Sequence, residues 1–285
     1  MASHLPPIVC GIDANYALGL QALMNSLVAA HPDGPENLRL FVLHHRLPDD
    51  TQTAILSHAR SIGLSTELCQ TSQPDDDLPV AAWWSKAMYL RLSITDELAD
   101  EPAALYLDAD TLVRRSLRPL LRLPLHDTPL AACIAQNPAD SGSAKPGWYR
   151  FGLSDREYFH SSVMLLNLTA CRDLKLMEKA RRLLIHHPEC LRFPDQDALN
   201  WAADDNWLRL DSTWNAYCDP GIEAGSLENH LADAAVLHFA GACKPWNPDY
   251  LNDRIRDIYR QYLGLGLASP KACPGSGVRG PDGSP

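Results

Sequence analysis

The pattern of apolar and polar positions divides the N-terminal part of the chain into short apolar runs separated by amphipathic stretches. Short apolar runs are typical of buried strands, and apolar positions spaced three or four apart are typical of helices that cover a sheet. The predicted strands are residues 8–12, 38–43, 64–68 and 103–107, and the two helices between the first three contain the apolar positions 20, 23, 27 and 28, and residues 50–62. This order predicts an α/β fold with a Rossmann-like, mostly parallel central sheet flanked by helices.

The remaining predicted elements alternate less regularly. The further predicted strands are residues 130–135, 162–168, 207–210 and 234–239, and the further predicted helices are residues 85–92, 172–187, 198–203 and 249–263. Polar, proline-punctuated stretches at residues 70–79 and 136–157 predict long loops. We expect one domain over residues 1–263, followed by a disordered tail over residues 264–285, where Gly, Pro and Ser dominate.

Two carboxylates follow the apolar run 103–107 at once, in the sequence Asp108-Ala109-Asp110. Residues two apart in an extended chain point to the same side, and open α/β sheets bind ligands beyond the carboxyl ends of their strands. Two neighbouring carboxylates repel each other, and a shared divalent cation relieves that repulsion. The pair therefore indicates a metal site, with a solvated turn as the alternative.

Composition narrows the classes of partner. The net charge is −10 and no basic run occurs, which argues against nucleic acid as a partner. The 8 cysteines form no CxxC pair and no zinc-finger spacing, and the first residues lack a basic start followed by a long apolar run. No stretch reaches about 18 consecutive apolar residues, so no stable membrane insertion is expected. These features predict a cytoplasmic protein with free thiols.

Polar residues also follow the first predicted strand. Asp13 and Asn15 could hydrogen-bond a nucleobase, and Tyr16 could stack on it. The alternative is a helix cap with a packed tyrosine. No GxGxxG follows this strand, which argues against a dinucleotide site.

A third cluster follows the predicted strand 234–239. His238 at its end could join the two carboxylates at one sheet edge, and a set of oxygen ligands with one nitrogen suits Mn²⁺ or Mg²⁺. Gly241 would let a phosphate approach the backbone, and Lys244 would neutralise it. The alternatives are a core histidine and a surface lysine.

Several ordered blocks give the chain a resemblance to a known family, the family 8 retaining glycosyltransferases, which include bacterial lipopolysaccharide α-galactosyltransferases and glycogenin. The resemblance extends over about residues 8–262, nearly all but the tail. The blocks are Asp13-Ala-Asn15-Tyr16, Tyr89-Leu-Arg91-Leu, Tyr106-Leu-Asp108-Ala-Asp110, Tyr158-Phe159 with Leu166-Asn167-Leu168, Asp195-Gln196-Asp197 with Leu199-Asn200, and His238-Phe-Ala-Gly241-Ala-Cys-Lys244-Pro245-Trp246. It implies a GT-A fold for the domain 1–263, a UDP-sugar donor, and Mn²⁺ with Mg²⁺ as the alternative metal.

The resemblance also implies roles for individual residues. Asp108, Asp110 and His238 would hold the metal on the diphosphate, with Ala109 between the two carboxylates. Residues at the nucleotide and phosphates would be Asp13, Asn15, Tyr16, Arg91, Gly241 and Lys244. Gln196 would lie on the β-face of the donor sugar, and Asp195 and Asp197 would bind sugar hydroxyls. Because an amide is a poor nucleophile, we expect Gln196 to stabilise an oxocarbenium ion in a front-face, retaining reaction, with Lys244 stabilising the leaving UDP.

Two departures from the family pattern concern the sugar pocket. His160-Ser161-Ser162 stands where relatives usually carry Asn, then Ser or Ala, then Gly, and Gln136 stands in a region where relatives often place an acidic residue. His160, Ser161, Gln136, Asp195 and Gln196 are the expected substrate-binding residues. Trp83-Trp84 is either an acceptor platform or a packed pair.

The expected activity is transfer of a hexose from UDP-galactose or UDP-glucose to a hydroxyl group. The tail lacks the basic residues of lipopolysaccharide enzymes, so the acceptor is expected to be soluble or small. A non-catalytic, UDP-sugar-binding or lectin-like relative is the alternative. An aspartyl-phosphate phosphatase also uses Asp-x-Asp, but Leu112 stands where that class requires Thr or Val.

Overall fold

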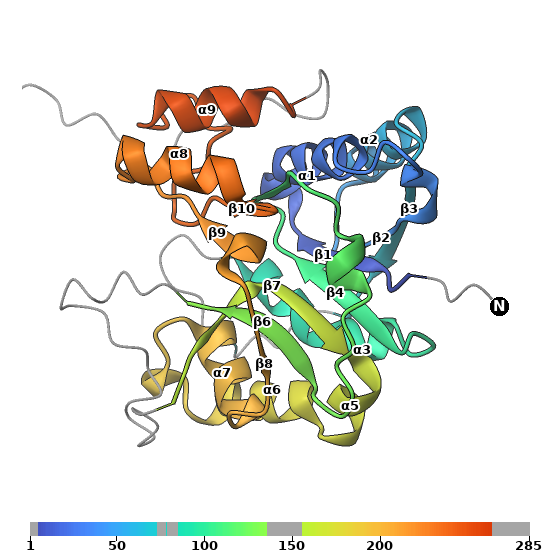
Figure 1. Ribbon diagram of the computed structural model, residues 1–285. Coiled ribbons are helices and arrows are strands. Elements are labelled where there is room, and N and C mark those ends of the chain that lie inside the picture. Colours follow the sequence, from blue (N-terminus) through green and yellow to red (C-terminus); the bar gives the residue numbers. More distant parts are fainter. Residues whose placement is uncertain (1–4, 73–77, 79–84, 136–155, 264–285) are drawn as a thin grey trace, which may run out of the picture.

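The computed structural model describes residues 5–72, 78, 85–135 and 156–263, and its centre is a seven-stranded sheet (Figure 1). The strand order is β3-β2-β1-β4-β7-β6-β8. Only β7 runs antiparallel to its neighbours β4 and β6, and the other paired strands are parallel. The expected mostly parallel α/β sheet is confirmed. Its strands are β1 (Ile8–Ile12), β2 (Arg39–His44), β3 (Ser65–Gln70), β4 (Ala103–Leu107), β6 (Leu130–Ile134), β7 (Phe159–Asn167) and β8 (Leu208–Leu210).

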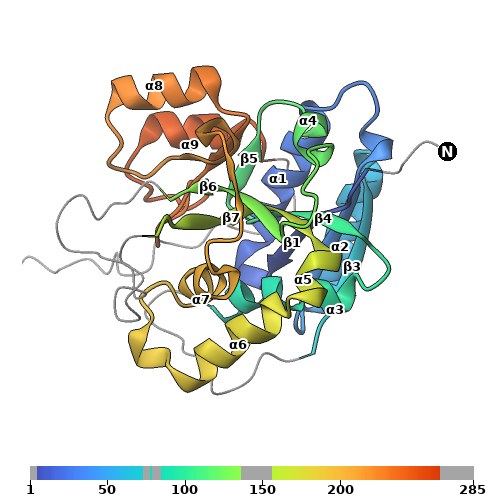
Figure 2. The same cartoon turned by 60° about the horizontal axis from the view of Figure 1, so that its bottom comes forward.

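Helices cover both faces of this sheet (Figures 1 and 2). On one face lie α1 (Ala17–Ala29) and α2 (Asp49–Ser61), and on the other lie α5 (Leu168–Asp173), α6 (Leu176–His186) and α7 (Pro194–Ala203). The strands supply alternate residues to the two layers, because successive side chains point to opposite faces. Ile8 and Cys10 pack with α1 and α2, whereas Val9 packs in the opposite core with α6 and α7.

A small second sheet extends the first at the carboxyl end of β4. It has the order β5-β10-β9, formed by β5 (Thr111–Val113), β10 (Val236–His238) and β9 (Ala216–Tyr217). Its own apolar core includes Leu112, Leu237, Phe239 and Tyr259, and the helices α8 (Ala224–Asp233) and α9 (Asp253–Arg260) lie beside it (Figure 1). Because β5 follows β4 after a three-residue turn, the two sheets meet at Asp108-Ala109-Asp110.

The boundaries differ from the sequence prediction at several places. Residues 85–92, expected as an α-helix, form a 3-10 helix (Lys86–Ser93) that continues into α3 (Ile94–Glu97). The helix expected over 172–187 is divided into α5 and α6 at Lys175, whose φ is +53°. The pattern gave no sign of β5, β9 or the one-turn helix α4 (Arg118–Leu121), since two to four residues are too few for a period to be read. Further 3-10 turns are Ala14–Tyr16, Pro35–Asn37, Pro188–Cys190 and Ser212–Asn215.

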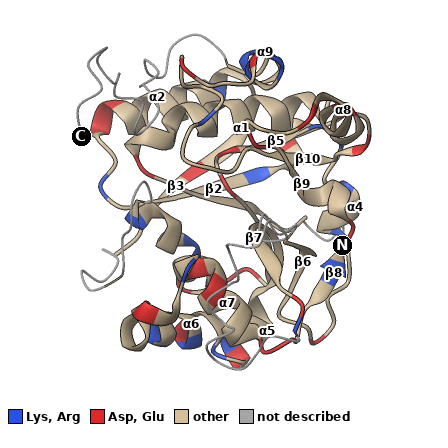
Figure 3. Ribbon diagram, turned by 90° about the vertical axis from the view of Figure 1, so that its left-hand side faces the viewer, with Lys and Arg blue, Asp and Glu red and all other residues tan. Residues whose placement is uncertain are grey.

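Charge and cysteines agree in part with the expectations. Lys and Arg are dispersed over many elements among Asp and Glu (Figure 3). Six cysteines are free thiols, namely Cys10, Cys69, Cys133, Cys171, Cys190 and Cys218. Cys243 is disulfide-bonded, so the expectation of free thiols is wrong for that residue. Among the described residues, no helix is long and apolar enough to cross a bilayer.

Candidate active site

A cavity of about 360 Å³ opens where β1, β4 and β10 end. Twelve residues expected at the site line it, together with residues not expected there, among them Gly11, Met88, Tyr106 and Tyr217. The twelve are Tyr16, Arg91, Asp108, Ala109, Asp110, His160, Ser161, Asp195, Gln196, His238, Gly241 and Lys244. Asp13, Asn15 and Asp197 do not line it, and Gln136 and Trp83-Trp84 lie outside the described residues.

Asp108 directly follows β4 and is anchored by its backbone, because its N–H donates to the carbonyl of Ser162 (2.9 Å). Its Oδ1 accepts hydrogen bonds from Arg91 (2.6 Å) and from the Tyr106 hydroxyl (2.7 Å). Burial, against the opposing effect of Arg91 and with a contribution from the neighbouring charge of Asp110, raises the pKa of the Asp108 carboxyl to about 6. The carboxylate is therefore held in place but costly to ionise, a state that a cation would relieve.

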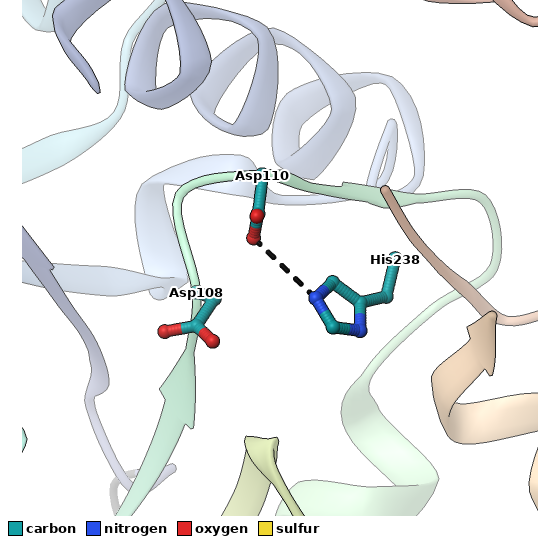
Figure 4. Close-up of side chains that lie close together, drawn as sticks. All are labelled: Asp108, Asp110 and His238. Atoms are coloured by element: carbon teal, nitrogen blue, oxygen red, sulfur yellow. Dashed lines mark ion pairs between the residues drawn. The ribbon is translucent and has the colours of Figure 1, made fainter. Parts of the chain in front are cut away.

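Asp110 lies in a different environment two residues on. Its Oδ2 accepts from Lys244 Nζ (2.5 Å), and its Oδ1 lies 3.7 Å from His238 Nε2 (Figure 4). Burial by itself would raise the pKa of Asp110, but Lys244 and His238 hold it below its usual range. Oδ1 is buried and has no hydrogen-bond partner among the residues that the structure describes. Such an atom is expensive in a folded protein and indicates a missing ligand.

His238 ends β10, and its ring points toward the two carboxylates (Figure 4). Burial lowers the pKa of His238 to about 4, so its imidazole is neutral and able to donate a lone pair. One ligand atom from each of Asp108, Asp110 and His238 lies within 4.8 Å of the others. The unpartnered Asp110 oxygen and this donor set fit a divalent cation.

The charges around the cavity also suit a cation and an anionic ligand together. The charged side chains of its wall are Arg91, Asp108, Asp110, Asp195 and Lys244. Three carboxylates and two cations leave a net charge of one negative unit. His160 and His238 add no charge, because burial lowers the pKa of each. A divalent cation would reverse the sign, and the cavity would then attract a diphosphate.

Arg91 lies between two carboxylates and is fully engaged by the protein. It pairs with Asp108 (2.6 Å) and Asp195 (3.1 Å), and its NH1 also donates to the Ser161 carbonyl (2.9 Å). Its guanidinium lies 4.7 Å from the centre of the Tyr106 ring. Arg91 therefore ties β4, β7 and α7 together at the cavity wall.

Gln196 on α7 is fixed at both ends of its amide. Its Oε1 accepts from the Ser161 backbone N–H (3.0 Å), and its Nε2 donates to the Tyr158 hydroxyl (2.9 Å). Tyr158 in turn donates to Asp197 Oδ1 (2.7 Å), and Asp197 Oδ2 accepts from the backbone of Arg192 (2.7 Å). Asp197 thus faces the protein at the start of α7 and acts on the cavity only through Tyr158.

Tyr16 and Lys244 form the opposite wall. Tyr16 packs edge-on against Trp246, with ring centres 5.6 Å apart, and Lys244 Nζ lies 5.7 Å from the Tyr16 ring centre. Around Gly241, at φ +100°, no heavy atom of the described residues beyond its chain neighbours lies within 4 Å of the place a Cβ would occupy, so the backbone there is open to a ligand. Asp13 accepts from the Asn15 backbone N–H (2.8 Å) and caps the turn that carries Tyr16.

Ser162, which sequence reasoning noted only as a replaced glycine, bonds to three side chains behind the cavity. They are His160, His238 and Asn215. Nothing in the sequence pointed to Asn215, because it reaches the site from the 3-10 turn before β9. Tyr106 had a readable signal: two residues before Asp108 on the same strand, it points to the same side.

Comparisons with known proteins agree with this site and fold. The chain matches the family described as Glycosyl transferase family 8 over residues 7–249. General stress protein A of Bacillus subtilis (strain 168) is 27% identical over 270 residues, covering 90% of this chain and 92% of that protein. Lipopolysaccharide 1,2-glucosyltransferase of Escherichia coli (strain K12) is 27% identical over 252 residues, covering 84% of this chain and 72% of that enzyme.

A crystal structure of the galactosyltransferase LgtC, in complex with donor and acceptor sugar analogues, superposes with a TM-score of 0.72. The two sequences are 25% identical, and the match covers 93% of this chain and 98% of that one. The resemblance drawn from the sequence is confirmed: the chain belongs to glycosyl transferase family 8 and is a glycosyltransferase with a GT-A fold.

Proposed function

We propose that this glycosyltransferase transfers a hexose from a UDP-sugar, UDP-galactose or UDP-glucose, to a hydroxyl of a small or soluble acceptor, with retention of the anomeric configuration and with a divalent metal. The observation that carries the proposal is the unpartnered oxygen of Asp110, facing His238 and lying within ligand reach of Asp108. The proposal is also supported by the similarity of this chain to General stress protein A, the lipopolysaccharide glucosyltransferase and LgtC.

Asp108, Asp110 and His238 would hold the metal, with Mn²⁺ preferred and Mg²⁺ as the alternative. When bound, the metal would neutralise charge on the diphosphate of the leaving UDP. Lys244 supplies a fixed positive charge beside it, because Asp110 and the Phe239 carbonyl (3.1 Å) hold its ammonium group in the buried wall. An ammonium already in position costs no reorganisation when the negative charge develops.

The nucleotide would lie along the wall formed by Tyr16, Ala109 and Gly241. Tyr16 offers a ring face for the uracil, and the open backbone at Gly241 admits a phosphate. Asp13 and Asn15 lie beside this wall and would contact the base from outside the cavity. Arg91 acts by holding Asp108 and Asp195 rather than as a free cation.

The donor sugar would lie against Gln196, Asp195, Ser161 and His160. The Gln196 amide is a poor nucleophile, but its fixed dipole can stabilise positive charge on the sugar carbon without reorientation. This supports a front-face substitution in which the acceptor hydroxyl attacks on the side that UDP leaves. Asp195 would bind a sugar hydroxyl, and Asp197 would position Gln196 through Tyr158.

The partners are thus a nucleotide-sugar and a hydroxyl acceptor, with no nucleic acid. Cytoplasmic action is part of the same proposal: the six free thiols are usual in a reducing compartment and support it, whereas the disulfide at Cys243 does not.

The test is UDP release from a panel of UDP-sugars, with Mn²⁺, with Mg²⁺ and with chelator. Slow metal-dependent hydrolysis of UDP-galactose or UDP-glucose without an acceptor is the expected result. Hydrolysis that persists in chelator would refute the metal site. Tight UDP binding without turnover of any donor, in the presence of hydroxyl acceptors, would favour a non-catalytic sugar-nucleotide-binding relative instead.

A further inference from the structure

The Ser162 hydroxyl lies where two imidazoles and an amide meet. Its oxygen is 3.0 Å from His160 Nδ1, 3.2 Å from His238 Nδ1 and 2.9 Å from Asn215 Nδ2. Ser162, His238 and Asn215 are buried, and His160 lines the cavity. A hydroxyl has one proton to donate and accepts at most two. Counting protons, together with the distances, therefore indicates the direction of each bond in this set.

Two of the donors are identified by their chemistry. The Asn215 amide nitrogen can only donate, and it lies closer to the hydroxyl oxygen than the amide oxygen does (2.9 against 3.2 Å). The Ser162 backbone N–H also can only donate, and its acceptor is His160 Nδ1 (3.4 Å). His160 Nδ1 is therefore an unprotonated acceptor. Its single lone pair faces the Ser162 hydroxyl at 3.0 Å, which is shorter than the 3.2 Å from that hydroxyl to His238 Nδ1, and the longer backbone contact shares the same lone pair.

His238 is then the second donor to the Ser162 oxygen. Because the Ser162 O–H donates its hydrogen bond to His160, the Ser162 oxygen acts only as an acceptor toward its other neighbours. It accepts from Asn215 and from one further donor, which is His238 Nδ1–H. A neutral imidazole protonated at Nδ1 has its lone pair at Nε2. That is the nitrogen which faces Asp110 Oδ1 at 3.7 Å.

We propose that Ser162 is a positioning residue that sets both histidines: it holds His238 with its proton on Nδ1 and Nε2 free for the metal, and it holds His160 with its proton on Nε2. This rests on the metal site of the proposed function. Hydrogen bonds to the outer nitrogen of a metal-binding histidine fix its ring and tautomer in this way. The metal-binding wall and the sugar-facing wall are thereby joined through one oxygen atom.

The consequence for His160 is a hydrogen-bond donor at the cavity. Within the part of the chain that the structure describes, no protein acceptor lies within bonding distance of its Nε2, and this atom is not among the buried unpartnered ones. Its Nε2–H is thus available to a ligand oxygen, a sugar hydroxyl or a phosphate oxygen of the donor. A ligand group that could only donate would be rejected there.

The first test measures Mn²⁺ alone by the electron paramagnetic resonance signal of the free ion. Ser162→Ala removes the hydroxyl without adding volume, and we expect its Mn²⁺ affinity to fall about 10- to 100-fold. Ser26→Ala is the matched control: Ser26 is also a buried serine, it accepts from the Val113 backbone N–H, and it contacts neither histidine. Its Mn²⁺ affinity should equal that of the wild type. Equal affinity of Ser162→Ala and wild type would overturn the role of Ser162.

The second test reads the tautomers directly in the wild-type protein. In ¹⁵N-histidine-labelled wild type, two-bond ¹H–¹⁵N spectra should show His160 protonated at Nε2 both with and without Mg²⁺, and His238 protonated at Nδ1 with Mg²⁺. The His160→Gln spectrum assigns the His160 signals. A proton on His160 Nδ1 would overturn this inference and leave the proposed function standing. Failure of the wild type to bind Mn²⁺ or Mg²⁺, with or without UDP, would overturn the metal site and this inference together.

Discussion

Asp108 and Asp110 belong to two different walls of the cavity, and their pKa values are shifted in opposite directions. The main-sheet wall, formed by Arg91, Asp108, Asp195 and Gln196, pairs one guanidinium with two carboxylates. The C-terminal wall, formed by Asp110, His238 and Lys244, pairs one carboxylate with an ammonium and an imidazole. Burial raises the pKa of Asp108 to about 6, whereas Lys244 and His238 hold the pKa of Asp110 below its usual range in spite of burial.

The difference follows from where the partner cations come from. Arg91 is shared, so neither Asp108 nor Asp195 receives its full charge, and both have raised pKa values because of burial. Lys244 is not shared in this way: among the described residues, the carboxylate that it hydrogen-bonds is that of Asp110. The spacing of a DxD motif therefore predicts proximity but not the ionisation of its members, which depends on segments far away in the chain.

Asp110→Asn is the substitution expected to have the largest effect on the difference between the two walls. Loss of one metal-ligating carboxylate should lower metal-dependent UDP-sugar turnover by about 10³-fold. It should also destabilise the fold by about 3–5 kcal/mol, because the buried Lys244 loses its partner. Turnover is measured by UDP release and stability by urea unfolding.

The double variant Asp110→Asn with Lys244→Met separates the two effects. Removing both buried charges should recover most of the lost stability, because a buried ion pair contributes little net free energy over neutral side chains. Turnover should stay low. Near wild-type turnover in the single variant would refute the metal assignment of Asp110.

Arg91→Met tests the main-sheet wall. It leaves the buried Asp195 and the partly buried Asp108 without their shared cation, and we expect a loss of about 3–5 kcal/mol in the free energy of unfolding. Arg91→Lys keeps the charge but cannot reach both carboxylates with one fork of donors, so its loss should be intermediate. Equal stability of Arg91→Lys and wild type would show that the guanidinium geometry is unimportant.

Gln196→Ala tests the sugar-facing part of the same wall. Because its amide contacts no predicted nucleotide residue, turnover should fall by about 10²-fold while UDP affinity changes less than about threefold. Gln196→Glu keeps the shape and adds a negative charge. Calorimetric titration with UDP and UDP-release kinetics give the two numbers, and equal losses in both would mean that Gln196 serves binding.

Much of this arrangement was predictable from local patterns. The strand 103–107 is found with the predicted bounds, and an apolar run that ends in Asp108-Ala109-Asp110 leaves little choice about where the carboxylates lie. The proximity of His238 was also predicted, because strand ends gather at one edge. The pairing partners were not: which of Arg91 and Lys244 serves which carboxylate depends on contacts across 17 and 134 residues.

The pH dependence of stability sharpens the contrast between the two carboxylates. An unfolded aspartate titrates near 4, and the folded pKa of Asp108 is about 6. Between these values the folded protein binds more protons, so the stabilising contribution of this group is present below about pH 4 and lost as the pH rises to about 6. In chelator, the free energy of unfolding of the wild type should therefore fall relative to that of Asp108→Asn across this interval. A difference that stays constant would contradict the raised pKa.

The smallest expected effects concern two helical glycines, only one of which supports the DxD turn. A Cβ on Gly19 in α1 would lie 2.7 Å from the Ala109 carbonyl oxygen and 2.9 Å from the Trp246 ring, at the junction of the two walls. Gly19→Ala should cost about 1–3 kcal/mol through overpacking and weaken Mn²⁺ binding, since the turn must shift.

Gly225 in α8 is the matched control, because a Cβ there would meet nothing within 4 Å and the residue is exposed. Gly225→Ala should stabilise the protein by about 0.4–1 kcal/mol and leave Mn²⁺ affinity unchanged. Urea unfolding should thus show a lower free energy of unfolding for Gly19→Ala and a higher one for Gly225→Ala. If both variants gained stability, α1 would have room to move away from Ala109, and the two walls would not depend on close packing beneath the turn.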